Sequence, residues 1–151
     1  MQMAKIHRYT CQPAIELIKV FEGFKSDVYA DCVGNKTIGY GHLIRKNEDF
    51  QNGITRKEGE QILKQDLYRA ERSVLRFINI NLSDEQFGAL VSFTFNLGGG
   101  SLQRSTLRMR LNRQENLVLV SNEFLRWCKA GGKVIRGLLR RRHAEKFMFL
   151  S

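Results

Sequence analysis

Hydrophobic residues recur at helical spacing over most of the chain. The pattern predicts a first helix over residues 14–24, and Pro13 suits its first turn. A much longer helix is predicted from Thr55 to about Ile78, because a T-x-x-E capping box opens an apolar stripe there. Further helices are predicted at 83–97, 105–112, 116–127 and 137–150, with glycines at 98–100 and 131–132 as breaks. The chain is therefore expected to be mostly helical.

The segment from Tyr29 to Leu43 has a different composition. Glycines are interspersed among its β-prone residues, and Val-Gly-Asn-Lys at 33–36 is typical of a turn between two short strands. A small antiparallel sheet beside many helices predicts an α+β fold with segregated elements. The predicted 55–78 helix would run about 35 Å at ~1.5 Å per residue, long enough to bridge two lobes and leave a cleft between them.

The length of 151 residues favours one domain. The sequence has no apolar run near the ~20 residues of a membrane-spanning helix, and its amino end lacks the apolar stretch of a signal peptide. We therefore expect synthesis in the cytoplasm, no stable membrane insertion, and a separate means of reaching any target outside it.

The net charge of +10 changes the expected partners rather than the fold. Eight lysines and arginines but only one acidic residue lie between Arg126 and Ser151. Nucleic acid, anionic lipid and anionic polysaccharide all fit such a surface, as does an ordinary solvated helix face, and charge alone does not choose. The three cysteines and three histidines lack metal-ligand spacing, so we expect neither a metal nor another cofactor.

Candidate chemistry gathers around the predicted hairpin. Glu22 ends the first apolar helix, Asp31 follows nine residues later, and Thr37 comes six residues after that. Two carboxylates in different environments are what acid–base hydrolysis requires. Apolar neighbours would favour a protonated Glu22, whereas a polar turn would keep Asp31 ionised, and these states match the acid and base of a glycosidase. On spacing alone, a glutamate beside a glycine is equally typical of a helix end.

This spacing also carries a family resemblance. Glu, eight residues, Asp, five residues, Thr is the pattern of the phage-type lysozymes, or endolysins, the glycoside hydrolase family of the T-even and lambdoid phage muramidases. The sequence resembles that family over roughly residues 12–150, including Thr37-Ile38-Gly39-Tyr40-Gly41-His42, Phe95-Asn96-Leu97-Gly98 and Gly137-Leu138-Leu139-Arg140-Arg141-Arg142-His143-Ala144-Glu145. The resemblance implies one lysozyme-like domain, with a small lobe at about 25–60 and a helical lobe at about 79–151 that includes the helix near 14–24.

The resemblance also implies roles for individual residues. Glu22 would be the general acid, Asp31 the second carboxylate, and Thr37 the hydroxyl that holds the attacking water for a single displacement with inversion. His42 and Asp66 would form a structural ion pair between hairpin and long helix, with a catalytic histidine as the alternative. The implied saccharide contacts are Leu43, Phe95, Asn96, Thr106 and Ser121, although Phe95 equally suits core packing.

The implied function is hydrolysis of the β-1,4 bond between N-acetylmuramic acid and N-acetylglucosamine in bacterial peptidoglycan. By the same resemblance, a monomer made in the cytoplasm of a bacterial host would reach the wall with the help of a holin. Three alternatives stay open: a lytic transglycosylase that forms an anhydro sugar, an inactive relative that only binds glycan, and a basic nucleic-acid-binding module. The retained Glu-Asp-Thr pattern disfavours the first two, and the lack of a zinc-finger or RNA-recognition signature disfavours the third.

Overall fold

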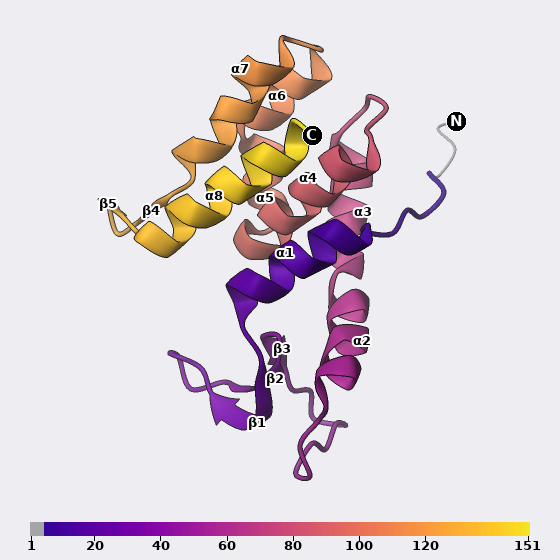
Figure 1. The fold of residues 1–151 in the computed structure, drawn as a ribbon, viewed down its shortest axis with the longest axis vertical. Coiled ribbons are helices and arrows are strands. Elements are labelled where there is room, and N and C mark those ends of the chain that lie inside the picture. The colour runs from indigo at the N-terminus through magenta and orange to yellow at the C-terminus, as the bar shows by residue number, and fades with distance from the viewer. Residues whose placement is uncertain (1–4) are drawn as a thin grey trace.

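The computed structural model describes residues 5–151, whose elements are shown in Figure 1. The helices are α1 (Gln12–Glu22), α2 (Arg56–Asp66), α3 (Tyr68–Phe77), α4 (Asp84–Leu97), α5 (Gly99–Arg104), α6 (Thr106–Asn112), α7 (Leu117–Asn122), the 3-10 helix η1 (Glu123–Arg126) and α8 (Arg136–Phe149). The strands are β1 (Lys25–Ala30), β2 (Lys36–Gly39), β3 (His42–Leu43), β4 (Lys129–Ala130) and β5 (Lys133–Val134). This arrangement confirms the predicted α+β class.

The first three strands form the predicted small sheet. They pair antiparallel in the order β1-β2-β3, and Thr37 lies opposite both Tyr29 and Leu43. Helix α2 packs against β2 and β3, so these elements form one end of the molecule (Figure 1). The break predicted at residues 131–132 is in fact the turn of a second, two-stranded sheet between β4 and β5.

The predicted long helix is two helices. Helix α2 ends before Leu67 and α3 begins after it, but Leu67 N–H still donates to the Leu63 carbonyl (2.9 Å) and Glu71 N–H to the Leu67 carbonyl (2.9 Å). The backbone at Leu67 keeps right-handed helical angles. The two helices therefore follow one another from the sheet end to the helical end, as Figure 1 shows, and together they serve as the expected bridge.

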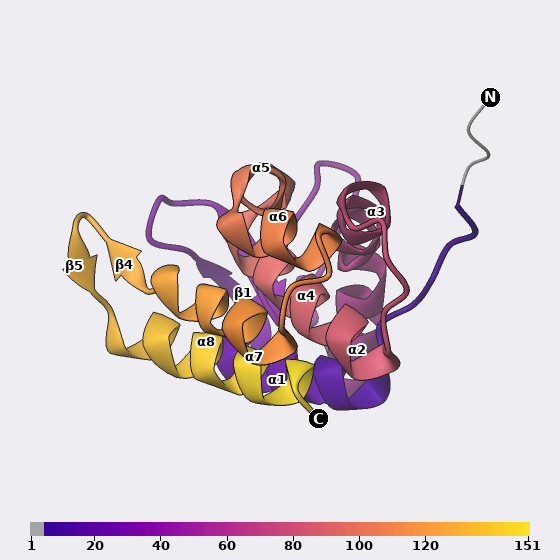
Figure 2. The same cartoon turned by 90° about the horizontal axis from the view of Figure 1, so that it is seen from above.

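Helix α4 is the centre of the core. It contacts α1, α3, α5 and α8, and its residues from Phe87 to Thr94 are all buried. Figure 2 shows α8 beside both α1 and α7.

Of the three glycines expected to end α4, only Gly98 caps it, since Gly99 and Gly100 begin α5. Within the described residues, none of these helices is both long and apolar enough to cross a bilayer.

The contact between α1 and α4 depends on a glycine. A Cβ added at Gly88 would lie 2.4 Å from the Cβ of Ala14 and 3.2 Å from the Sγ of Cys11. Gly88→Ala should therefore push α1 outward and lower the free energy of unfolding by about 1–3 kcal/mol, measured by urea denaturation. Gly137→Ala on α8 is the control, because a Cβ there meets nothing within 4 Å. If both variants lower the free energy of unfolding equally, close packing of α1 against Gly88 is not the cause.

Candidate active site

The Glu22 carboxyl group lies at a junction of three elements. Glu22 is the last residue of α1, and its Oε1 accepts a hydrogen bond from Nη1 of Arg141 on α8 at 2.7 Å. On the other side is the turn between β2 and β3, where a Cβ added at Gly41 would lie 3.4 Å from Oε2 of Glu22. Gly41 has φ +81°, a conformation that favours glycine, so the turn and the close approach both depend on it.

One expectation about this region was wrong, and a second holds only in part. Glu22 was expected among apolar neighbours, but a guanidinium group contacts its carboxyl. The basic carboxyl-terminal segment was expected to be a cationic surface, and five of its eight lysines and arginines are exposed, but Arg141 and Arg142 are buried. The sequence held one indication of this, because Glu145 lies four residues after Arg141 and three after Arg142, the spacing of helical ion pairs.

A buried polar cluster holds Arg141 in place. The Glu145 carboxylate accepts a hydrogen bond from Ser92 Oγ at 2.5 Å and lies 3.4 Å from Nε of Arg141 and 2.7 Å from Nε of Arg142. Nη2 of Arg142 donates to Oδ1 of Asn96 at 2.8 Å. Burial raises the pKa of Glu145, whereas the two arginines and Ser92 act in the opposite direction. Burial lowers the pKa of Arg142, and Glu145 opposes that change.

Asp31 and Thr37 are held by hydrogen bonds of the hairpin itself. Oδ1 of Asp31 accepts from the backbone N–H groups of Val33 (3.0 Å) and Asn35 (2.8 Å). Within residues 5–151, no hydrogen bond engages Oδ2 of Asp31. The Thr37 hydroxyl donates to the Asn35 carbonyl at 3.0 Å, and the residue is only 3% exposed. One hairpin turn therefore orients both side chains.

His42 forms the expected contact with Asp66 and a second one that the sequence analysis missed. Its Nδ1 lies 2.8 Å from Oδ2 of Asp66 on α2, and its Nε2 lies 3.0 Å from Oε1 of Glu48. Burial alone would lower the pKa of His42, but the hydrogen bonds to Glu48 and Asp66 raise it above its ordinary value. Burial raises the pKa of Asp66, and His42 opposes that rise. Because two carboxylates face one ring, we assign the charged form to His42.

Replacing His42 should therefore have a pH-dependent effect. With its folded pKa raised, the stability that His42 contributes is complete below its unfolded pKa of about 6.5 and is lost as pH rises through the folded value. The pKa of Glu48 is lowered despite burial, by the backbone N–H of Arg45 and by His42, so its contribution is lost as pH falls through that value. His42→Asn should lower the free energy of unfolding by about 2 kcal/mol near pH 5.5 and by less near pH 9.

Urea denaturation at the two pH values measures this difference. His143→Asn is the matched control, because His143 is exposed on α8, and we expect it to change stability at neither pH. If His42→Asn lowers the free energy of unfolding equally at both pH values, His42 stabilises the protein through packing alone and not through its charge.

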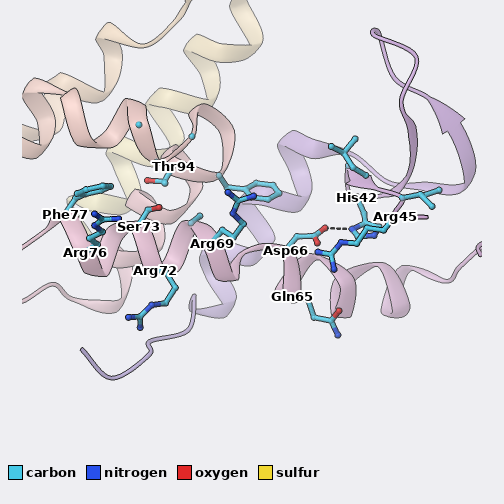
Figure 3. A pocket seen from close by; sticks show the side chains of 18 residues that line it. His42, Arg45, Gln65, Asp66, Arg69, Arg72, Ser73, Arg76, Phe77 and Thr94 are labelled. Carbon is cyan, nitrogen blue, oxygen red and sulfur yellow. Dashed lines mark hydrogen bonds and ion pairs between the residues drawn. The ribbon is translucent and has the colours of Figure 1, made fainter. Parts of the chain in front are cut away.

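A pocket of about 930 Å³ lies between β3, α3 and the junction of α4 with α5. Glu22, Asp31 and Thr37 do not line it, but Gly41 does, and a Cβ added at Gly41 would lie 3.4 Å from Oε2 of Glu22. Figure 3 shows the side chains around it, with His42 and Asp66 on one side and Thr94 on another. Since it is lined from both ends of the molecule, this pocket corresponds to the expected cleft.

The predicted saccharide contacts are not all brought together. Leu43 and Phe95 line the pocket, and Phe95 also packs against the core. Asn96 is half-buried and accepts the hydrogen bond from Arg142. Thr106 begins α6 outside the pocket lining, and Ser121 is fully buried with its hydroxyl donating to the Val118 carbonyl at 2.7 Å.

The cysteine, histidine and carboxylate side chains form neither a metal-ligand cluster nor a disulfide within residues 5–151. Within residues 5–151, no three or more histidine, cysteine, aspartate or glutamate side chains gather in a way that could hold a metal ion. Cys11, Cys32 and Cys128 are all free thiols. The site described above consists of the carboxylates of Glu22 and Asp31, the Thr37 hydroxyl and the Arg141 guanidinium group.

Comparison with known proteins identifies the family and the fold. The phage lysozyme family model matches residues 19–145. The endolysin of Bacillus phage B103 is 39% identical over 142 residues, which is 93% of this chain but 53% of that endolysin, so the chain spans about half of its length. The endolysin of Salmonella phage P22 is 34% identical over 140 residues, covering 91% of this chain and 94% of the endolysin. A solved mutant of P22 lysozyme superimposes with a TM-score of 0.86 at 32% identity, covering 95% of this chain and 99% of that one. The lysozyme-like fold is thereby confirmed, and the chain belongs to the phage lysozyme family.

Proposed function

We propose that this protein is an endolysin that hydrolyses the β-1,4 bond between N-acetylmuramic acid and N-acetylglucosamine in bacterial peptidoglycan. The observation that carries the proposal is the position of Glu22. Its carboxyl group accepts a hydrogen bond from Arg141 at 2.7 Å, and its Oε2 would lie 3.4 Å from a Cβ added at Gly41, a residue that lines the pocket. Because Oε1 accepts from Arg141, a proton carried by Glu22 would sit on Oε2, on the side of the hairpin turn. Glu22 is therefore the proposed general acid for the glycosidic oxygen.

Asp31 and Thr37 are proposed to handle the attacking water. Two backbone N–H groups engage only Oδ1 of Asp31, which leaves Oδ2 to accept from water and to face the positive charge that develops at the anomeric carbon. The Thr37 hydroxyl already donates to Asn35, so it would accept a hydrogen bond from the same water. A water activated opposite the acid implies inversion at the anomeric carbon.

We further propose that the protein works as one lysozyme-like unit and as a monomer, without metal or cofactor. Leu43, Phe95, Asn96, Thr106 and Ser121 remain proposed saccharide contacts. Synthesis in the cytoplasm of a bacterial host followed by holin-dependent release to the wall is the proposed route. The names of the related B103 and P22 proteins, both endolysins, support a role in host lysis.

Product analysis on purified peptidoglycan tests the proposal. Mass spectrometry before and after borohydride reduction should detect reducible muramic acid ends that have gained one water. Anhydromuramic ends would identify a lytic transglycosylase instead, and Asp31 and Thr37 would lose their proposed roles. If no products form, a glycan-binding or nucleic-acid-binding role would replace hydrolysis, and salt-sensitive DNA binding would favour the latter.

A further inference from the structure

The contact between Arg141 and Glu22 is by itself unfavourable for a general acid. A guanidinium group within hydrogen-bond distance of a carboxyl group favours the ionised form of that carboxyl, whereas a general acid must carry its proton. Nη1 of Arg141 lies 2.7 Å from Oε1 of Glu22, and the next residue, Arg142, adds a second buried positive charge. A negative charge close to the two arginines is therefore needed if Glu22 is to stay protonated.

Glu145 supplies that charge from the next turn of α8. Its carboxylate lies 3.4 Å from Nε of Arg141 and 2.7 Å from Nε of Arg142. Apart from Glu22 itself, no other carboxylate of residues 5–151 forms an ion pair with either arginine. The Glu145 side chain is fully buried, so dissolved salt screens its charge far less than it screens a surface ion pair.

The hydrogen bonds around Glu145 identify it as an ionised carboxylate. Its Oε2 accepts from Ser92 Oγ at 2.5 Å, from Nη2 of Arg142 at 3.1 Å and from Nε of Arg141 at 3.4 Å. A guanidinium nitrogen donates and cannot accept, so a proton on this oxygen would have to displace these donors. Burial raises the pKa of Glu145, but two buried arginines without a counter-charge would cost more than the buried carboxylate.

Other charged groups do not take over this role at Glu22. On the hairpin side the carboxyl faces Gly41, which has no side chain. Lys19, one turn earlier on α1, is already paired with Glu60 at 2.8 Å and with Glu16 at 3.3 Å. Asp31, the second carboxylate of the proposed site, is on the hairpin, and its Oδ1 accepts from backbone N–H groups there.

We propose that Glu145 is a positioning residue that acts through Arg141, because its buried negative charge lets the arginine orient Glu22 without forcing Glu22 into the ionised form. This inference rests on the proposed muramidase function and deepens it. Arg141 sets the orientation of the general acid, and Glu145 sets how long the acid keeps its proton as the pH rises.

The test changes the buried charge in opposite directions. Glu145→Gln makes the cluster more positive by one charge, and Arg142→Met makes it less positive by one. Arg140→Gln is the matched control, because Arg140 is exposed on α8 next to Arg141 and forms no ion pair with the carboxylates of residues 5–151. The measurement is kcat on purified peptidoglycan over a series of pH values, with circular dichroism at each pH to establish that the variant is folded.

We expect the alkaline limb of kcat against pH to move by about one pH unit to lower pH in Glu145→Gln and by a similar amount to higher pH in Arg142→Met. The limb of Arg140→Gln should stay where it is in the wild type. A lower kcat with an unmoved limb, or a limb that moves the same way in both variants, would give the cluster a purely structural role and overturn the proposal. Since a variant of a buried cluster can unfold, the direction of the shift in the other variant is then decisive.

Carbon-13 NMR of the Glu22 carboxyl group makes the same comparison without turnover. Its signal is assigned by its loss in Glu22→Gln, and the midpoint of its titration should move down in Glu145→Gln and up in Arg142→Met. Unmoved midpoints would overturn the charge compensation even in an active enzyme. A wild type that cleaves no peptidoglycan but shows both shifts would instead refute the proposed function and support the compensation.

Discussion

Glu22→Gln is expected to lower the rate of peptidoglycan cleavage by about 10³-fold or more while the protein stays folded. Glutamine has the shape of glutamate, and its carbonyl oxygen can still accept the 2.7 Å hydrogen bond from Nη1 of Arg141. It cannot donate a proton to the glycosidic oxygen, and a positioned general acid contributes about 10²–10⁴-fold to such reactions. The measurement is the initial rate of release of reducing ends from purified peptidoglycan, with thermal unfolding of the same sample.

Glu16→Gln provides the control for this variant. Glu16 is on the same helix, its side chain is largely exposed, and it lies 3.3 Å from Nζ of Lys19, so the same change of charge is made away from the site. We expect its rate to stay within about twofold of the wild type, because exposed ion pairs contribute little. Equal activity of folded wild type and Glu22→Gln would remove Glu22 from the mechanism.

Glu145→Gln is expected to lower the free energy of unfolding by about 3–5 kcal/mol. The Glu145 carboxylate is fully buried, and the Arg142 guanidinium that lies 2.7 Å from it is fully buried as well. Neutralising the carboxylate leaves a buried positive charge uncompensated, which is costlier than removing both charges. Since Glu145 also lies 3.4 Å from Nε of Arg141, we expect Glu22 to lose part of its orientation and the enzyme part of its activity.

Urea denaturation of three variants separates this effect from a general loss of charge. Glu115→Gln is the control, because Glu115 is partly exposed and 3.9 Å from Arg110, and its loss should change stability by less than about 1 kcal/mol. Combining Glu145→Leu with Arg142→Met should restore much of the stability, since an apolar pair of similar size often replaces a buried ion pair without penalty. If Glu145→Gln is as stable as Glu115→Gln, removing the Glu145 carboxylate leaves no uncompensated charge in the buried cluster.

Local sequence patterns predicted the elements well where neighbouring residues decide them. The capping boxes at Thr55 and Ser83 both form, because the side chain and the N–H group that it caps are three residues apart. The same local logic failed at Gly99 and Gly100, which lie inside α5 rather than in a break. A Cβ added at Gly99 would lie 2.6 Å from Oγ of Ser73, so close packing against α3, rather than a helix stop, accounts for that glycine.

The sequence by itself determined the α+β class, the order of the helices and the Glu22, Asp31 and Thr37 pattern with its family. These depend on periodicity, caps and spacing along the chain. Only the tertiary structure decided which charged residues are inside. Arg141 reaches Glu22 across 119 positions, and Arg142 and Glu145 are buried together, whereas Arg69 and Arg76 on α3 stay exposed. The physical reason is that burying a charge is favourable only when other groups compensate it. The local spacing of Glu145 supplies one such group, but Glu22, Ser92 and Asn96 come from distant elements and no local pattern contains them.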